Sequence, residues 1–145
     1  MNVHATAVVL ADRGVLIAGR SGAGKTGLAL ALLAHARSAG RFARLVSDDQ
    51  LLLRAASGRL VCEVPSAIAG LAELRGLGPR PVRHEPRVVV DLLVRLVEPA
   101  KAERYPDAAE ETLAGCAVPL LRLAEGDRLA AVLAVASRLS LPPFG

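Results

Sequence analysis

Aromatic residues are almost absent from this chain of 145 residues, which has two Phe, one Tyr and no Trp, or 2% of the sequence. Proteins that bind single-stranded nucleic acid stack bases on aromatic side chains, so this composition excludes such a platform. Lys and Arg number 18 against 14 Asp and Glu, and no dense basic stripe is present, so we expect no nucleic-acid partner. The small positive excess suits phosphate ligands or an acidic partner.

Cysteine and long apolar runs are also scarce. Cys62 and Cys116 are the only cysteines and form no C-x-x-C pair, which argues against a zinc site and favours buried, reduced thiols. No apolar run is long enough to span a membrane. The residues after Met1 are strand-like and lack the charged and apolar regions of a signal peptide. We therefore expect a cytoplasmic protein that folds as one domain over residues 1–145.

One stretch fits the P-loop pattern G-x-x-x-x-G-K-[ST]: Gly19, Arg20, Ser21, Gly22, Ala23, Gly24, Lys25 and Thr26. An apolar run precedes it and an apolar-rich helical pattern follows it, which is the strand, loop and helix context that the motif requires. In such a loop, backbone N–H groups and the helix N-terminus bind phosphate oxygens. Lys25 can reach the β- and γ-phosphates and Thr26 can hold Mg²⁺. The stretch predicts nucleotide or phosphate binding.

Two adjacent acids, Asp48 and Asp49, follow a short predicted strand. The carboxyl end of a strand in an α/β sheet is a usual place for a catalytic or metal-binding carboxylate. Phosphoryl transfer needs phosphate positioning, Mg²⁺ and a group that orients or deprotonates the acceptor, and these acids are candidates for that last role. An isolated acidic pair is more often an exposed turn or a helix cap. The P-loop one crossover helix upstream favours the functional interpretation here.

The other segments predict one α/β domain. Strands are expected at residues 5–10, 15–18, 45–46, 51–54, 59–64, 88–97 and 118–123. Helices are expected at residues 26–38, about 67–74 and 128–139. Ser57-Gly58 is typical of a hairpin turn, and the charged stretch from 99 to 112 of an exposed connection.

Four features in the same order resemble the C-terminal catalytic domain of the bacterial HPr kinase/phosphorylases. The loop is similar to the family's G-x-S-G-x-G-K-[ST]. Two further segments are similar to its V-[AS]-D-D and E-[IL]-R-G-L-G signatures: Val46-Ser47-Asp48-Asp49 and Glu73-Leu74-Arg75-Gly76-Leu77-Gly78. The family's histidine, which precedes the P-loop lysine by 21 residues, is matched by His4 before Lys25. The resemblance implies a mixed-sheet P-loop fold related to phosphoenolpyruvate carboxykinase, in a short form with the catalytic domain alone.

This resemblance also implies a function. The enzyme would use ATP to phosphorylate a serine of HPr, the phosphocarrier of the phosphotransferase system. In reverse it would use inorganic phosphate to cleave phosphoserine-HPr and release pyrophosphate. Asp49 would accept the serine proton, Lys25 would stabilise phosphate charge and His4 would assist near the phosphates. Residues 19–26 would bind ATP, and three residues would hold Mg²⁺: Thr26, Glu73 and Asp48. A homo-oligomer is implied, since family members assemble as hexamers.

Two regions depart from the family pattern. Where the family has Tyr-Asp-Arg with a catalytic arginine, this chain has Tyr105-Pro106-Asp107, and only Arg104 is close. The family's basic loop R-P-G-R-N, associated with dephosphorylation, is replaced by the more acidic residues 124–128. These departures favour kinase over phosphorylase activity. Two other functions stay open: a small-molecule or carboxykinase-like P-loop kinase, and a nucleotide-sensing regulatory module without catalysis.

Overall fold

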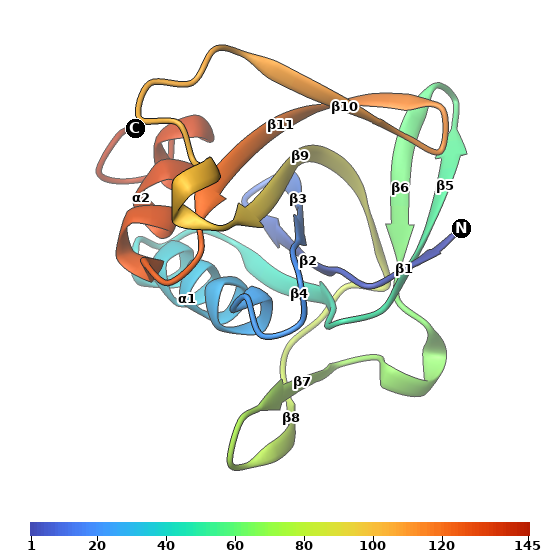
Figure 1. Ribbon diagram of the computed structural model, residues 1–145. Coiled ribbons are helices and arrows are strands. Elements are labelled where there is room, and N and C mark those ends of the chain that lie inside the picture. The colour runs from blue at the N-terminus through green and yellow to red at the C-terminus, as the bar shows by residue number, and fades with distance from the viewer.

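The computed structural model describes residues 1–145, and its main feature is a strongly curved, mixed nine-stranded sheet (Figure 1). The helices α1 (Lys25–Ser38) and α2 (Arg128–Arg138) lie side by side on one face of this sheet. The strands are β1 Asn2–Val3, β2 Thr6–Leu10, β3 Arg13–Ala18, β4 Ala43–Ser47, β5 Leu51–Ala56, β6 Arg59–Glu63, β7 Leu71–Leu74, β8 Gly78–Pro81, β9 Arg87–Val97, β10 Ala109–Leu113 and β11 Cys116–Ala124. Two short 3₁₀ helices complete the fold, η1 Ser66–Ile68 and η2 Pro99–Lys101.

Strand β9 organises the sheet. Its C-terminal part lies parallel to β3 on one side and to β11 on the other, while its N-terminal part pairs antiparallel with β6. Beyond β3, the strands β2 and β4 follow in antiparallel steps, so β4 points the same way as β3. The carboxyl ends of β3, β4, β9 and β11 therefore meet at one edge of the sheet. That edge is where α/β proteins place their ligand sites.

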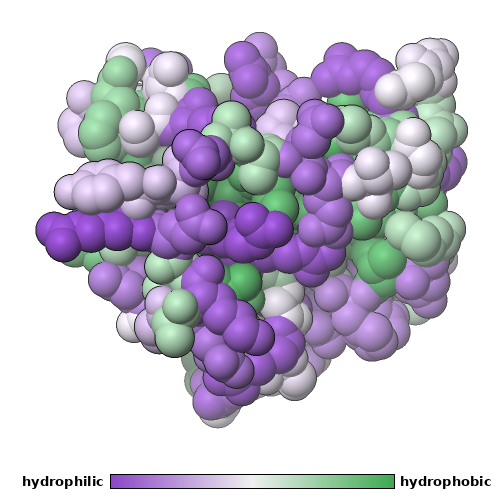
Figure 2. All heavy atoms as spheres, turned by 45° about the horizontal axis from the view of Figure 1, so that its top comes forward, coloured by the Kyte–Doolittle hydropathy of each residue, from purple (hydrophilic) through white to green (hydrophobic).

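Two aliphatic cores pack against the two faces of the sheet, as the period-2 alternation of strand side chains requires. In β3, Val15 and Ile17 face the helices, whereas Leu16 faces the second core, which the curved sheet encloses. Cys62 and Cys116 belong to this second core as free, buried thiols, as predicted. Burial raises the pKa of the Cys62 thiol to about 12. The face of the molecule in Figure 2 is mostly hydrophilic, with hydrophobic residues in separate small areas.

The predicted α/β class with a mixed sheet is confirmed, and the predicted strands and the two long helices are present with small shifts at their ends. The prediction of a helix at residues 67–74 is wrong. Only η1 is helical there, Gly70 with φ 75° ends it, and β7 then pairs with β8 in a hairpin that projects from the body of the protein (Figure 1). The connection predicted at 99–112 contains η2 and also β10, which pairs with β11. None of the helices is long and apolar enough to cross a membrane.

Candidate active site

The glycine-rich loop connects β3 to α1 at the edge where the strands end. Gly22 and Gly24 have φ values of 83° and 97°, in the left-handed region that glycine adopts without strain and that lets successive N–H groups converge on an anion. Lys25 begins α1 and is buried, and its Nζ donates to the carbonyl oxygens of Gly19 and Arg20 at 3.1 and 3.2 Å. An ammonium has three donors, so one remains for a phosphate oxygen.

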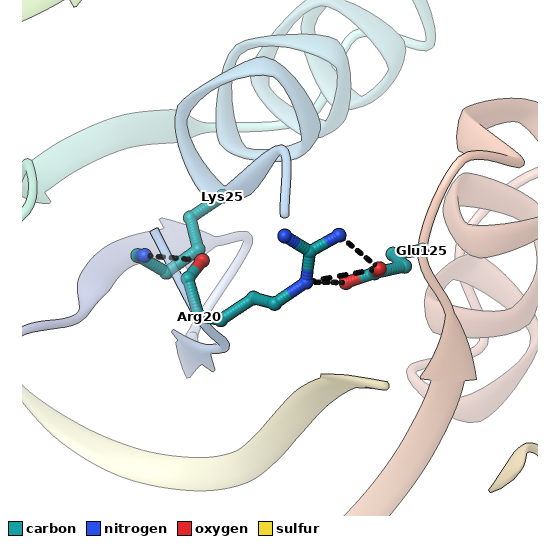
Figure 3. Close-up of polar contacts among 3 residues, drawn as sticks. All are labelled: Arg20, Lys25 and Glu125. Atoms are coloured by element: carbon teal, nitrogen blue, oxygen red, sulfur yellow. Dashed lines mark hydrogen bonds and ion pairs between the residues drawn. The ribbon is translucent and has the colours of Figure 1, made fainter. Parts of the chain in front are cut away.

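Arg20 points the opposite way from Lys25, toward the turn between β11 and α2 (Figure 3). Its Nη2 lies 2.5 Å from Oε1 of Glu125, and its Nε also donates to that carboxylate. The hydrogen bonds and charge of Glu125 raise the pKa of the Arg20 guanidinium. Glu125 is largely buried and Arg20 exposed, so the arginine covers the carboxylate. The loop is thereby tied to the end of β11.

Asp48 is the polar centre of the site, and it is buried. Its Oδ1 accepts hydrogen bonds from the hydroxyls of Thr26 at 2.7 Å and Thr6 at 3.1 Å. Its Oδ2 accepts the backbone N–H of Glu73 at 2.9 Å. One carboxylate therefore joins the start of α1, the start of β2 and the β7–β8 hairpin, and its burial is compensated by hydrogen bonds.

Asp49 differs from its neighbour in every respect that matters for chemistry. It is exposed, and its carboxylate forms no hydrogen bond or ion pair. Its backbone has φ 65°, which is uncommon outside glycine, and the Gln50 N–H bonds back to the Asp48 carbonyl at 2.9 Å. The Asp49 N–H donates to Thr6 Oγ1 at 3.2 Å, which holds this turn in place. An exposed, unpaired carboxylate next to the loop is suited to accept a proton.

The other predicted site residues lie at the same edge. Glu73 is exposed, and its backbone bond to Asp48 fixes it beside the loop. His4 is exposed and lies two residues before Thr6. The structure thus brings together the loop, Asp48, Asp49 and Glu73.

The site fits a Mg²⁺ ion that is shared with phosphates. Thr26 gives its hydroxyl proton to Asp48, so the lone pairs of its oxygen stay available to a cation. No group of three or more His, Cys, Asp or Glu side chains is arranged to hold a metal ion without help. Mg²⁺ usually binds one or two carboxylates together with water and substrate phosphates, which is what this donor set offers.

Sequence reasoning missed two residues of this site. The Thr6 hydroxyl donates to the Asp48 carboxylate and accepts the Asp49 N–H. The sequence signal that could have indicated Thr6 is a hydroxyl at a fully buried position in an otherwise aliphatic strand. Glu125 was noted only as a departure from a basic loop, and its pairing with Arg20 across 105 residues leaves no local pattern.

Fold and site together define the class as an α/β domain with a P-loop-type sequence and an acidic strand end at one edge of its sheet. The chain belongs to the HPr Serine kinase C-terminal domain family, whose model matches residues 1–138. It is similar to the HPr kinase/phosphorylase of Bordetella pertussis, with 33% identity over 151 residues that cover 94% of this chain and 47% of that protein. Its similarity to the HPr kinase/phosphorylase of Clostridium beijerinckii is 36% over 76 residues, or 52% of this chain and 23% of that protein.

Among solved structures, the Hpr(Ser) kinase/phosphatase from Coxiella burnetii matches with a TM-score of 0.81 and 27% sequence identity, covering 96% of each chain. The mixed α/β fold is therefore the fold of that kinase/phosphatase. The chain spans about half or less of the length of the curated relatives named above.

Proposed function

We propose that this protein transfers the γ-phosphate of ATP to a serine of the phosphocarrier HPr, and that residues 1–145 act as one catalytic domain. Membership of the HPr Serine kinase C-terminal domain family supports the reaction and the substrate. The observation that carries the proposal is the Asp48 network, because it fixes the phosphate-binding loop, an unpaired carboxylate and the β7–β8 hairpin next to one another.

The transfer assigns one role to each group. The serine oxygen forms a bond to the γ-phosphorus, the bond from that phosphorus to the β–γ bridging oxygen breaks, and ADP leaves. The serine proton passes to the carboxylate of Asp49. Lys25 and the loop N–H groups stabilise the charge on the phosphate oxygens, which is the main contribution a protein makes to phosphoryl transfer. His4, in the connection between β1 and β2, would assist near the phosphates.

Thr26, Glu73 and Asp48 are the residues we propose for the Mg²⁺ site. The ion would neutralise charge on the β- and γ-phosphates. Thr26 would contribute its hydroxyl oxygen and Glu73 its exposed carboxylate. Asp48 already accepts three hydrogen bonds, so its part is to orient Thr26 and to hold Glu73 in reach.

The reverse reaction uses the same groups. Inorganic phosphate attacks phosphoserine, the bond from phosphorus to the serine oxygen breaks, Asp49 returns a proton to that oxygen, and pyrophosphate forms. We propose that this direction is slow here. The turn after β11 carries Glu125 and Asp127 where the family's loop is basic, so it offers fewer positive charges to the inorganic phosphate that attacks phosphoserine.

The test uses purified protein, HPr and labelled Mg-ATP, followed by phosphoamino-acid analysis of HPr. Acid-stable phosphoserine on HPr, absent with an HPr that lacks its serine acceptor, is expected. Tight ATP binding without phosphoserine would favour a nucleotide-sensing module instead. Transfer to a small molecule but not to HPr would favour a small-molecule or carboxykinase-like kinase. Incubation of phosphoserine-HPr with phosphate, with detection of pyrophosphate, measures the reverse direction.

A further inference from the structure

A cavity of about 490 Å³ lies beside the phosphate-binding loop, on the side away from Asp48. The loop residues Gly22 and Gly24 form one wall, and the turn from Glu125 to Arg128 forms another. Leu28, Leu96 and Pro99 add apolar surface. A volume of this size is typical of a small-molecule site. The acids lie toward β4 and the cavity toward β9 and β11, so this cavity offers room for the other end of a nucleotide bound to the loop.

Arg128, the first residue of α2, lies directly on the first turn of α1. A Cβ atom built on Gly27 would be 2.1 Å from Nη2 and 2.6 Å from Cζ of Arg128, so a larger residue at position 27 would push this flexible guanidinium aside. Glycine is among the poorest helix formers, so its presence in this turn needs a reason, and the room it leaves for the guanidinium is one. Gly27 therefore leaves room for the guanidinium of Arg128 to lie against the first turn of α1.

Arg128 is exposed and has no charged partner within the protein. It forms no ion pair with a carboxylate, and its side chain donates no hydrogen bond within the protein. The two acids of its own turn are engaged elsewhere, since Glu125 binds Arg20 and Asp127 accepts the Ala130 N–H at the start of α2. The guanidinium lies near the positive ends of two helix dipoles, so an anion bound there would be attracted by the helix N-termini and by Arg128 together. The arrangement therefore favours an anionic ligand at this place.

We infer that Arg128 is a nucleotide-binding residue whose guanidinium contacts the α- and β-phosphates of ATP, with the nucleoside in the cavity between the loop and the β11–α2 turn. This inference rests on the proposed function, because it takes ATP as the molecule that the loop binds. It assigns a specific role to one arginine of a turn that otherwise departs from the family's basic loop.

The test is isothermal titration of the protein with Mg-ATP, Mg-ADP and adenosine. Arg128→Gln should weaken ATP and ADP binding by about 10-fold to 100-fold, the range for one lost charge-assisted hydrogen bond or two, and leave adenosine binding nearly unchanged. Arg128→Lys should keep part of the affinity. Arg138→Gln, at the other end of the same helix, is the matched control and should bind like the wild type.

A second variant makes the contact itself testable. Gly27→Ala should displace the guanidinium and weaken ATP binding, but it should weaken it little further in a chain that already carries Arg128→Gln. Affinity losses that simply add, or an Arg128→Gln protein that binds ATP and ADP within twofold of wild type, would overturn the inference. A wild-type protein that binds no nucleotide at all would instead refute the proposed function.

Discussion

Asp48 and Asp49 are neighbouring residues of the same type, but Asp48 is buried and hydrogen-bonded whereas Asp49 is exposed. Replacing Asp48 by Asn measures how much its carboxylate contributes to the stability of the fold. The carboxylate of Asp48 accepts three hydrogen bonds while buried. An amide of the same shape can keep its oxygen toward Thr6 and Thr26, but its NH₂ group then faces the Glu73 N–H, donor against donor. One charge-assisted hydrogen bond is lost and two become neutral.

The size of the effect follows from those bonds. A hydrogen bond to a charged group contributes about 1.5–3 kcal/mol, and a neutral one about half of that. The variant also no longer buries a charge, which offsets part of the loss. We expect Asp48→Asn to lower the free energy of unfolding by about 2–4 kcal/mol. For a domain of this size that corresponds to a Tm lower by roughly 6–12 °C.

Thermal melting and urea unfolding check this value, with Asp12→Asn as the control. Asp12 is exposed and pairs only with its neighbour Arg13, so its variant should stay within about 0.5 kcal/mol of wild type. Thr6→Val, alone and combined with Asp48→Asn, should show a coupling energy of about 0.5–3 kcal/mol. If Asp48→Asn has the same Tm as the Asp12→Asn control and shows no coupling energy with Thr6→Val, the network does not hold the site together.

The remaining predictions concern activity and pH. Asp49→Asn should lower the rate of HPr phosphorylation at least about 10²-fold, the usual loss for a general base, with Tm unchanged; an active Asp49→Asn beside an inactive but folded Asp48→Asn would exchange the two roles. Lys25→Ala should lower the same rate roughly 10²–10³-fold, because preorganised charge at the phosphates is removed, and near-normal turnover would argue against that role. Arg95 holds the pKa of Glu111 below its ordinary value of 4.5, so the pair stabilises the fold above that pH and loses its effect as pH falls through the lower, folded value. The Tm difference between wild type and Glu111→Gln should therefore be present at neutral pH and vanish in stronger acid; a difference that persists there contradicts the assignment. Burial raises the pKa of Cys62 from 9.0 to about 12, so stability should fall as pH rises between those values, and iodoacetamide should label this thiol only after unfolding in urea.

The elements around the loop could be predicted because their signals are local. The spacing of glycines, Lys25 and Thr26, with an apolar run before and a helical pattern after, depends on residues within one strand–loop–helix unit. The hairpin at Ser57-Gly58 is likewise local, and both residues have the positive φ values, 51° and 76°, that such a turn needs.

The β7–β8 hairpin and the division of labour between the acids depend on contacts far apart in the sequence. Residues 71–74 contain no signal strong enough to separate a short helix from a strand, and pairing with residues 78–81 decides the matter. Asp48 becomes structural because Thr6, 42 residues earlier, and the Glu73 backbone, 25 residues later, donate to it. No spacing rule connects those positions.

The most direct test of the proposed function is mass spectrometry of HPr after incubation with Mg-ATP and either the wild-type protein or Asp49→Asn. We predict one added phosphate on a serine of HPr with the wild type, and loss of nearly all of it with Asp49→Asn, although both proteins bind ATP. Unmodified HPr with a wild-type protein that binds ATP, or equal phosphorylation by both proteins, would contradict it.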